Sequence, residues 1–273
     1  MYTTLIDSVA LSKLDKDNLV IVDCRFSLAN VTYGSRAYAR AHIPGAIYAS
    51  LDDDLSGPPL TDHGRHPLPS PDALMATFDY MGICKETQVV VYDDANGMIA
   101  SRLWWMLRYM GHTAVSVLDG GWQAWKEAGL PTMTGIESPS PTLYNNCRDG
   151  GPHREWLVLH DEIPNAPLLI DSRKAERYRG EIEPLDPIAG HISGAANYFY
   201  ERNWDENGRY LPKTQIKAQF EAVLGDTPVE EAIIYCGSGV SSCVNLLAMA
   251  HAGMGNGRLY VGSWSEQCYL RQT

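Results

Sequence analysis

The 273-residue chain lacks several features that would place it quickly in a class. Its six cysteines form no Cys-x-x-Cys pair, and no apolar run is long enough to span a membrane. It also has no excess of positive charge, because 33 acidic and 22 basic side chains leave a net charge of −11. These absences argue against a disulfide framework, a zinc site and a membrane span. They also argue against nucleic acid or an anionic membrane surface as a partner.

The first residues of the chain and its cysteine usage bear on its compartment. Met1–Ser8 lacks the basic and apolar regions of a signal peptide, and scattered single cysteines are typical of a reducing environment. We therefore expect a cytoplasmic protein. Its hydrophobic residues (45%) and charged residues (20%) are typical of a globular protein with a substantial core.

Four landmarks of the first half recur in the second half, in the same order and at nearly constant spacing. Leu19–Arg25 resembles Leu168–Arg173, Ala41–Ala46 resembles Gly190–Ala195, Val89–Asp93 resembles Ile233–Cys236, and Leu118–Trp122 resembles Leu259–Trp264. The period is too long for a solenoid unit. The sequence therefore predicts two copies of one domain, at residues 1–135 and 153–273. Residues 136–152, rich in Pro, Gly, Ser and Asn, are expected to be a surface linker.

Each copy alternates short apolar strands with helical stretches, which predicts an α/β domain with a mainly parallel sheet flanked by helices. The expected strands are Leu19–Val22, Ala46–Tyr48, Val89–Tyr92, Ala114–Leu118, Leu168–Ile170, Ala195–Asn197, Ala232–Tyr235 and Arg258–Val261. The expected helices are Pro71–Met81, Met98–Met110, Trp122–Ala128, Lys213–Val223 and Ser242–His251.

A Gly/Ser segment, Cys236–Ser242, lies between an expected strand and an expected helix. Several backbone N–H groups of such a loop can point at one sulfur atom, and the helix N-terminus adds positive partial charge. Both effects favour the thiolate, which is the nucleophilic form of cysteine. Cys236 is therefore predicted to be a nucleophile; the alternative is a buried, inert cysteine that merely precedes a helix.

The corresponding position of the first copy is Asp93. An aspartate cannot carry a transferable sulfur atom, so we expect the second copy to be catalytic. The first copy, residues 1–135, is then an inactive scaffold that contributes to the cleft. The alternative is that both copies are inert.

Other polar motifs are duplicated and therefore favour structural roles. The Asp-x-Arg pairs Asp23–Arg25 and Asp171–Arg173 each follow a strand and are expected to brace the sheet edge. His42 and His191 each precede Ile-x-Gly-Ala, and the same reasoning favours structural histidines.

Three residues without such a duplicate are candidates for the reaction site. Arg177 and Arg179 could bind an anionic substrate, or they could form a solvated basic loop paired with Glu181 and Glu183. His66 could move a proton to a leaving group, or it could be an ordinary loop histidine.

The duplicated Asp-x-Arg, His-Ile-x-Gly-Ala and Gly-x-Trp motifs, with a cysteine loop only in the second copy, resemble the tandem-domain rhodanese family over essentially the whole chain. The resemblance implies two tandem rhodanese-like domains and a sulfurtransferase that carries sulfane sulfur as a persulfide on Cys236. The sulfur would pass from a small anionic donor to a thiol or cyanide, or to a thiol protein. It implies no metal and no organic cofactor. The persulfide cradle would be Gly237, Ser238, Gly239, Val240, Ser241 and Ser242.

Gly237 and Ser238 are similar to the uncharged loop of 3-mercaptopyruvate sulfurtransferases, whereas thiosulfate-preferring members usually carry basic residues there. In the 3-mercaptopyruvate subfamily the serine works with a histidine and an aspartate of the first domain. The resemblance places these roles on Ser238, His66 and Asp52.

The same subfamily uses two arginines to bind the substrate carboxylate. The first matches Arg177, but the second falls on Asp186. Either Arg179 compensates for that loss, or the donor is not mercaptopyruvate.

Two other functions compete with an enzyme of sulfur transfer. A cysteine-based phosphatase usually has an arginine that closes the loop, and Cys236–Cys243 contains none. A non-catalytic relay or binding protein would carry the persulfide without turning over small molecules.

Overall fold

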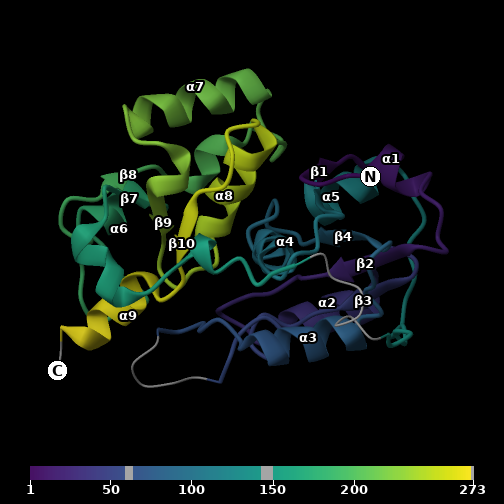
Figure 1. Cartoon of the computed structure of the whole chain (residues 1–273). Coiled ribbons are helices and arrows are strands. Elements are labelled where there is room, and N and C mark those ends of the chain that lie inside the picture. The colour runs from purple at the N-terminus through teal and green to yellow at the C-terminus, as the bar shows by residue number, and fades with distance from the viewer. Residues whose placement is uncertain (59–63, 143–149, 272–273) are drawn as a thin grey trace. The chain divides into compact units, whose positions relative to one another are not determined.

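The computed structural model describes residues 1–58, 64–142 and 150–271. These residues form two compact units, each built around a five-stranded parallel sheet (Figure 1). The first unit comprises Met1–Ser56, Pro69–His153 and Asn207–Arg209. The second comprises Gly57–Leu68, Arg154–Glu206 and Tyr210–Thr273.

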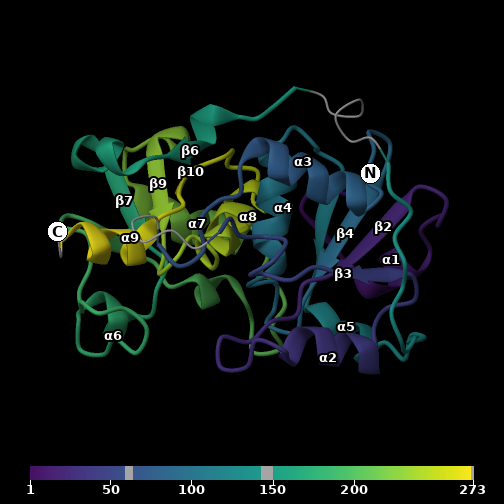
Figure 2. The ribbon, with the colours of Figure 1, turned by 90° about the horizontal axis from the view of Figure 1, so that it is seen from below.

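The first unit has the strand order β1-β5-β4-β2-β3. Its strands are β1 (Leu5–Ile6), β2 (Leu19–Asp23), β3 (Ala46–Tyr48), β4 (Gln88–Tyr92) and β5 (Val115–Leu118). Its helices are α1 (Ser8–Ser12), α2 (Tyr33–Arg40), α3 (Pro71–Tyr80), α4 (Ala100–Tyr109) and α5 (Gly121–Glu127). Figure 2 shows α3 and α4 on one face of the sheet and α2 and α5 on the other. Because both faces are covered, the central strand is a continuous apolar run with Val89, Val90 and Val91 fully buried.

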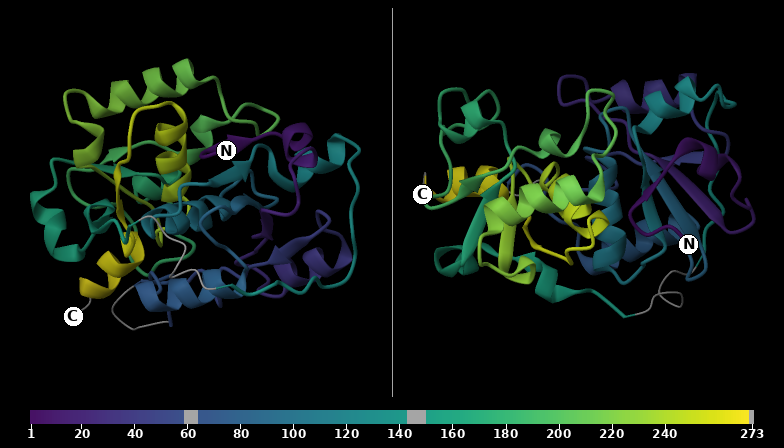
Figure 3. Two further views of the ribbon diagram at one scale, coloured as in Figure 1. Left: turned by 45° about the vertical axis from the view of Figure 1, so that its right-hand side comes forward. Right: turned by 90° about the horizontal axis from the view of Figure 1, so that it is seen from above.

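The second unit repeats this topology with the order β6-β10-β9-β7-β8. Its strands are β6 (Leu157–Val158), β7 (Leu168–Asp171), β8 (Ala196–Asn197), β9 (Ala232–Tyr235) and β10 (Arg258–Tyr260). Its α-helices are α6 (Ala175–Tyr178), α7 (Lys213–Leu224), α8 (Ser242–His251) and α9 (Ser263–Leu270), and short 3-10 turns lie at Arg154–Trp156, His160–Asn165, Tyr200–Asn203 and Val229–Glu231. Helix α7 packs on α8 (Figure 3). Within the described residues, no helix is both long and apolar enough to cross a bilayer.

The predicted strands and helices are all present, with ends that differ by at most two residues. The largest difference is in α4, which begins at Ala100 rather than at Met98. Sequence analysis did not predict β1, β6, α1, α2, α6 or α9. Strands β1 and β6 have two residues each, and α6 has four, which is too short for a periodic pattern.

The duplicated Asp-x-Arg motifs brace the sheets, as predicted. The guanidinium of Arg25 donates to Asp23 at 2.6 Å and to the Ala41 carbonyl at 2.7 Å. Arg173 makes the same two contacts, to Asp171 at 2.6 Å and to the Gly190 carbonyl at 2.7 Å. These ion pairs are buried, so each charge depends on its partner for the stabilisation that water would otherwise provide.

The duplicated histidines are structural as well. His42 stacks on Tyr38, and its Nδ1 lies 2.8 Å from the Tyr38 carbonyl oxygen. His191 repeats the arrangement with Tyr178, at 2.7 Å. Each ring therefore ties the end of a helix to the turn that precedes the edge strand.

The boundary between the units differs from the predicted division in one important place. Gly57–Leu68 lies inside the predicted first domain, but it groups with the second unit. The Arg65 amide donates to Ser265 Oγ at 3.2 Å, which ties this segment to α9. A repeat in the sequence reveals the period of the domain but not where an intervening loop packs.

The first described part of the predicted linker lies on the first unit. Thr142 donates to the Ile83 carbonyl at 2.7 Å, and its own amide donates to the Asp79 carbonyl at 2.8 Å. The rest of the predicted linker includes residues 143–149, with Cys147, which lie outside the described residues.

Candidate active site

Cys236 directly follows β9 and is 1% exposed. Its backbone is anchored to the start of α9, because its amide donates to Ser263 Oγ at 3.1 Å and its carbonyl accepts from the Trp264 amide at 3.0 Å. The next carbonyl, of Gly237, accepts from the Ser265 amide at 2.8 Å. Three hydrogen bonds therefore fix the start of the loop to the first residues of α9.

Gly239 gives the loop its curl. Its φ is +72°, a backbone conformation that favours glycine, and a Cβ here would overlap the backbone of Val261. The side chain of Val240, within the loop, is buried, and α8 begins at Ser242. The predicted strand–loop–helix arrangement around Cys236 is present.

The surroundings of the sulfur favour its charged form. Burial acts to raise the pKa of the Cys236 thiol, but hydrogen-bonding groups of the loop outweigh it and the pKa lies below its ordinary value. These groups are the Ser241 and Ser242 hydroxyls and the Ser238 and Ser242 amides. The Ser242 hydroxyl is buried and has no hydrogen-bond partner of regular geometry among the described residues, which leaves it available to the sulfur.

The equivalent loop of the first unit holds an anion in the same way. One carboxylate oxygen of Asp93 accepts from the Ala95 and Gly97 amides, and the other accepts from the Ile99 and Ala100 amides, all at 2.8 Å. Burial raises the pKa of Asp93 above its ordinary value, and these four N–H groups only partly offset that rise. Because each oxygen already accepts two N–H groups, the arrangement fits an ionised carboxylate.

The two loops use the same backbone positions. Ala95 and Ile99 lie two and six residues after Asp93, and Ser238 and Ser242 lie two and six residues after Cys236. The amides of both pairs point at the central group of their own loop. A nest of N–H groups that holds a carboxylate in one unit therefore faces a sulfur atom in the other.

His66 lies beside the cysteine loop. Its Nδ1 is 2.7 Å from Ser238 Oγ, and both side chains are 6% exposed. The structure thus brings together these two predicted residues, although they are far apart in the sequence. The hydroxyl is placed to pass a proton between the imidazole and a group bound at Cys236.

Arg177 lies beside Gly237 of the same loop. It donates to Glu183 at 2.6 Å and to Asp186 at 3.2 Å. Burial acts to raise the pKa of Glu183, but the hydrogen bond and charge of Arg177, together with the Leu185 and Asp186 amides, outweigh it and hold that pKa below its usual range. A Cβ added to Gly237 would lie 3.6 Å from the terminal nitrogens of Arg177.

The family-model comparison and two of the most similar relatives agree on one family. The model of the rhodanese-like domain matches residues 8–128 and 154–268. A Pseudomonas aeruginosa protein assigned as a 3-mercaptopyruvate sulfurtransferase is 43% identical over 258 residues, which cover 93% of this chain and 91% of that protein. A Mycobacterium tuberculosis protein assigned as a thiosulfate sulfurtransferase is 38% identical over 257 residues, covering 92% and 88%.

The chain belongs to the rhodanese family. It is a sulfurtransferase with two rhodanese-like domains. The solved structure of the 3-mercaptopyruvate sulfurtransferase from Leishmania major has the same fold, with a TM-score of 0.84 and 33% identity. That match covers 99% of this chain and 75% of that one.

Two further predicted site residues are Arg179 and Asp52. Arg179 is half exposed and pairs with Glu181 at 2.6 Å. This pairing agrees with the alternative prediction for Arg179, a solvated basic loop paired with nearby glutamates. Asp52 belongs to the first unit, where it follows β3 with an exposed side chain. Burial, followed by the charge of Asp53, raises the pKa of Asp52. Its pairing with His66 stays a prediction.

Sequence reasoning missed one residue of the site, Arg65. Arg65 pairs with Asp186, and its Nη2 would lie 2.9 Å from a Cβ at Gly237. Arg65 directly precedes His66 in the sequence, which was the only indication of its role. A basic residue next to a candidate histidine does not predict a site until the position of its loop in the fold is known.

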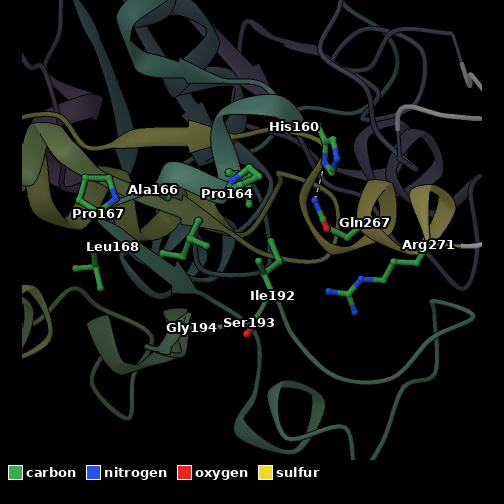
Figure 4. Close-up of a pocket in the computed structure, with 12 residues that line it drawn as sticks. His160, Pro164, Ala166, Pro167, Leu168, Ile192, Ser193, Gly194, Gln267 and Arg271 are labelled. Atoms are coloured by element: carbon green, nitrogen blue, oxygen red, sulfur yellow. Dashed lines mark hydrogen bonds between the residues drawn. The ribbon is translucent and has the colours of Figure 1, made fainter.

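A separate cavity of about 400 Å³ lies elsewhere in the second unit. Figure 4 shows its lining, in which Gln267 Nε2 donates to His160 Nδ1 at 2.8 Å and Arg271 extends beside them. It opens at the amino end of β7, whereas Cys236 follows the carboxyl end of β9. Its lining does not include the cysteine loop. Among the described residues, no cluster of His, Cys, Asp or Glu is placed to hold a metal ion.

Proposed function

We propose that this rhodanese transfers sulfur from 3-mercaptopyruvate to a thiol or to cyanide through a persulfide on Cys236. The observation that carries the choice of donor is the 2.7 Å contact between His66 Nδ1 and Ser238 Oγ at the cysteine loop. The lowered pKa of the Cys236 thiol supports its role as nucleophile.

In the first half-reaction, the Cys236 thiolate attacks the sulfur of 3-mercaptopyruvate. A sulfur–sulfur bond forms as the carbon–sulfur bond breaks, and the electron pair leaves with carbon as the enolate of pyruvate. The enolate takes a proton at carbon and becomes pyruvate. In this proposal Ser238, which is hydrogen-bonded to His66, supplies that proton.

Thiosulfate makes a different demand on the site. Its departing group is sulfite, which is stable without a proton, so a histidine–serine pair has no role in that step. The pair therefore favours 3-mercaptopyruvate, although the M. tuberculosis relative is assigned to thiosulfate. Thiosulfate is the second donor to compare.

In the second half-reaction, an acceptor thiolate or cyanide attacks the outer sulfur of the persulfide. The new bond forms on that sulfur, and the Cys236 thiolate returns as leaving group. The backbone nest supports both states of the enzyme, since each places negative charge on a sulfur inside it. A small thiol, cyanide or the thiol of another protein can act as acceptor.

The proposed cycle draws on no metal and no organic cofactor, because sulfur–sulfur bonds exchange readily between thiolates. We place it in the cytoplasm. The free cysteines among the described residues, including Cys236 and Cys243, suit a reducing compartment.

The test is kcat/KM for 3-mercaptopyruvate and for thiosulfate in the wild type and in His66→Ala. General acid catalysis is worth about 10²–10⁴ in rate, so we expect a loss of at least about a hundredfold with 3-mercaptopyruvate. The loss with thiosulfate should be only a few-fold, about the scale of one weakened contact. His160→Ala, an exposed histidine of the same unit, is the matched control.

Three results would contradict the proposal. Equal losses with both donors in His66→Ala would remove the proton-donor role. Failure of the Cys236 peptide to gain the mass of one sulfur atom after incubation with donor, in a folded protein, would remove the persulfide. A protein that gains the sulfur but shows no turnover with simple thiols would be a relay rather than an enzyme of this donor.

A further inference from the structure

Two guanidinium groups lie beside Gly237, the residue that follows the nucleophile. They come from separate segments, Arg65 from Gly57–Leu68 and Arg177 from α6. A Cβ built on Gly237 would meet Arg65 Nη2 at 2.9 Å and Arg177 Nη1 at 3.6 Å. Gly237 is therefore bordered by two guanidinium groups, each of which is paired with a carboxylate.

Both guanidinium groups have donors that remain available. Arg65 uses one terminal nitrogen for Asp186, and its Nε is buried without a hydrogen-bond partner among the described residues. Arg177 uses Nε and Nη2 for Glu183 and Asp186. No described residue accepts from Arg65 Nη2 or Arg177 Nη1, the nitrogens nearest to Gly237.

Asp186 holds the two arginines together. One of its carboxylate oxygens pairs with Arg65 and the other with Arg177, and its side chain is only 2% exposed. Sequence analysis placed Asp186 where related sulfurtransferases have their second arginine. Here a carboxylate at that position draws an arginine in from another segment.

The carboxylates of this cluster differ in how firmly they keep their charge. Glu183 accepts from Arg173 and Arg177, and its pKa is held low. Burial raises the pKa of Asp186, although Arg65 opposes that rise. Asp186 is therefore the carboxylate of the two that more readily takes up a proton.

We propose that Arg65 and Arg177 together bind the anionic head of the sulfur donor, and that Asp186 is the positioning residue that holds Arg65 beside Arg177. The head is the carboxylate of 3-mercaptopyruvate or the sulfonate-like end of thiosulfate. A planar guanidinium with two free N–H groups suits either one. The proposal deepens the function proposed above, since it names how the donor of that reaction is held.

The first test is Arg65→Gln, assayed with each donor at varied concentration. Removing a charge-assisted hydrogen bond is expected to lower kcat/KM about ten- to a hundredfold, mainly through KM. Arg258→Gln is the matched control, because Arg258 has the same side-chain exposure (25%) and also pairs with a carboxylate, Glu162. It should stay within about threefold of the wild type.

The second test measures anion binding without turnover. Pyruvate and sulfite, the leaving groups of the two donors, are titrated into the resting enzyme by calorimetry. We expect binding of at least one of them to the wild type and to Arg258→Gln, and a loss of about tenfold or more in affinity in Arg65→Gln. Whichever anion binds more tightly identifies the head group that the site prefers.

Several results would overturn the proposal. One is Arg65→Gln binding both anions as the wild type does; another is a wild type that binds neither. A loss confined to kcat with 3-mercaptopyruvate would mean that Arg65 only positions His66. If neither donor loads Cys236 but Arg65-dependent anion binding persists, the proposed sulfur transfer fails while the anion site stands. Thermal unfolding of each variant checks that the protein is folded.

Discussion

The nest in the first unit allows a sharp prediction about stability. Asp93→Asn keeps the shape of the side chain but replaces one carboxylate oxygen with an amide NH2 group. Whichever way the amide turns, one oxygen accepts from two backbone N–H groups and the NH2 group faces the other two. Those two N–H groups, from Ala95 and Gly97 or from Ile99 and Ala100, are left without an acceptor.

The magnitude follows from that count. A buried N–H group without a partner costs about 1–3 kcal/mol, so the pair costs about 2–6 kcal/mol. Asp93 is fully buried, which removes water as a substitute acceptor. Such a loss is a large part of the stability of an ordinary domain.

Hydrogen–deuterium exchange measured on peptides of β4 and α4 reports on the first unit by itself. Their opening free energy should fall by about 2–6 kcal/mol in Asp93→Asn. The control is Asp53→Asn, an exposed carboxylate of the same unit, which should change it by less than about 0.5 kcal/mol.

A change of less than about 1 kcal/mol in Asp93→Asn would refute the reasoning. It would mean that the carboxyl already carries a proton or that the four N–H groups are satisfied in another way. Unchanged exchange in the first unit with faster exchange in the second would contradict the assignment of the effect to this loop.

Two further predictions concern ionisation. Ser241→Ala and Ser242→Ala each remove a hydroxyl that lowers the pKa of the Cys236 thiol, so the reaction of Cys236 with iodoacetamide near neutral pH should slow by about tenfold. The control is Ser116→Ala, which removes another buried hydroxyl that has no hydrogen-bond partner among the described residues. Rates equal to wild type in Ser241→Ala and Ser242→Ala would contradict the role of the serines. Burial, with the charge of Lys213, lowers the pKa of His251 to about 4, below its unfolded value of about 6.5. The unfolded chain therefore binds a proton first, and stability is lost as the pH falls from about 6.5 to about 4, by less than about 3 kcal/mol because the ring is partly exposed. Denaturant unfolding at both ends of that range should show a smaller loss in His251→Gln, and an equal loss would dismiss His251 as the cause.

The fold was largely predictable because its pattern is local and repeated. Strands such as Val89–Tyr92 and Ala232–Tyr235 are buried on both faces and read as unbroken apolar runs. The duplicated Asp-x-Arg and histidine motifs aligned the copies, and each was found bracing its sheet. The short edge strands β1 and β6 escaped notice, because pairing with a neighbouring strand, rather than their own composition, makes them strands.

The candidate site was also predictable where its residues are contiguous in the sequence, and was not where the fold brings distant residues together. Cys236 and its loop are contiguous, so the glycine and serine positions could be interpreted in the sequence itself. The contact of His66 with Ser238 was expected only from resemblance to a family. Arg65 escaped notice, and Arg179 was chosen in its place because it stands near Arg177 in the sequence, whereas it lies on the surface with Glu181.

The sequence by itself determined that this chain has two copies of one α/β domain. It also determined that only the second copy can carry sulfur, because a cysteine side chain such as Cys236 can form a persulfide and an aspartate such as Asp93 cannot. Tertiary structure decided how the sulfur is surrounded, because N–H direction and the packing of Gly57–Leu68 depend on backbone geometry and distant contacts. It also decided the meaning of Asp186. In the sequence this residue is the loss of an arginine, and in the folded unit it is the carboxylate that pairs with Arg65 and Arg177 beside the nucleophile.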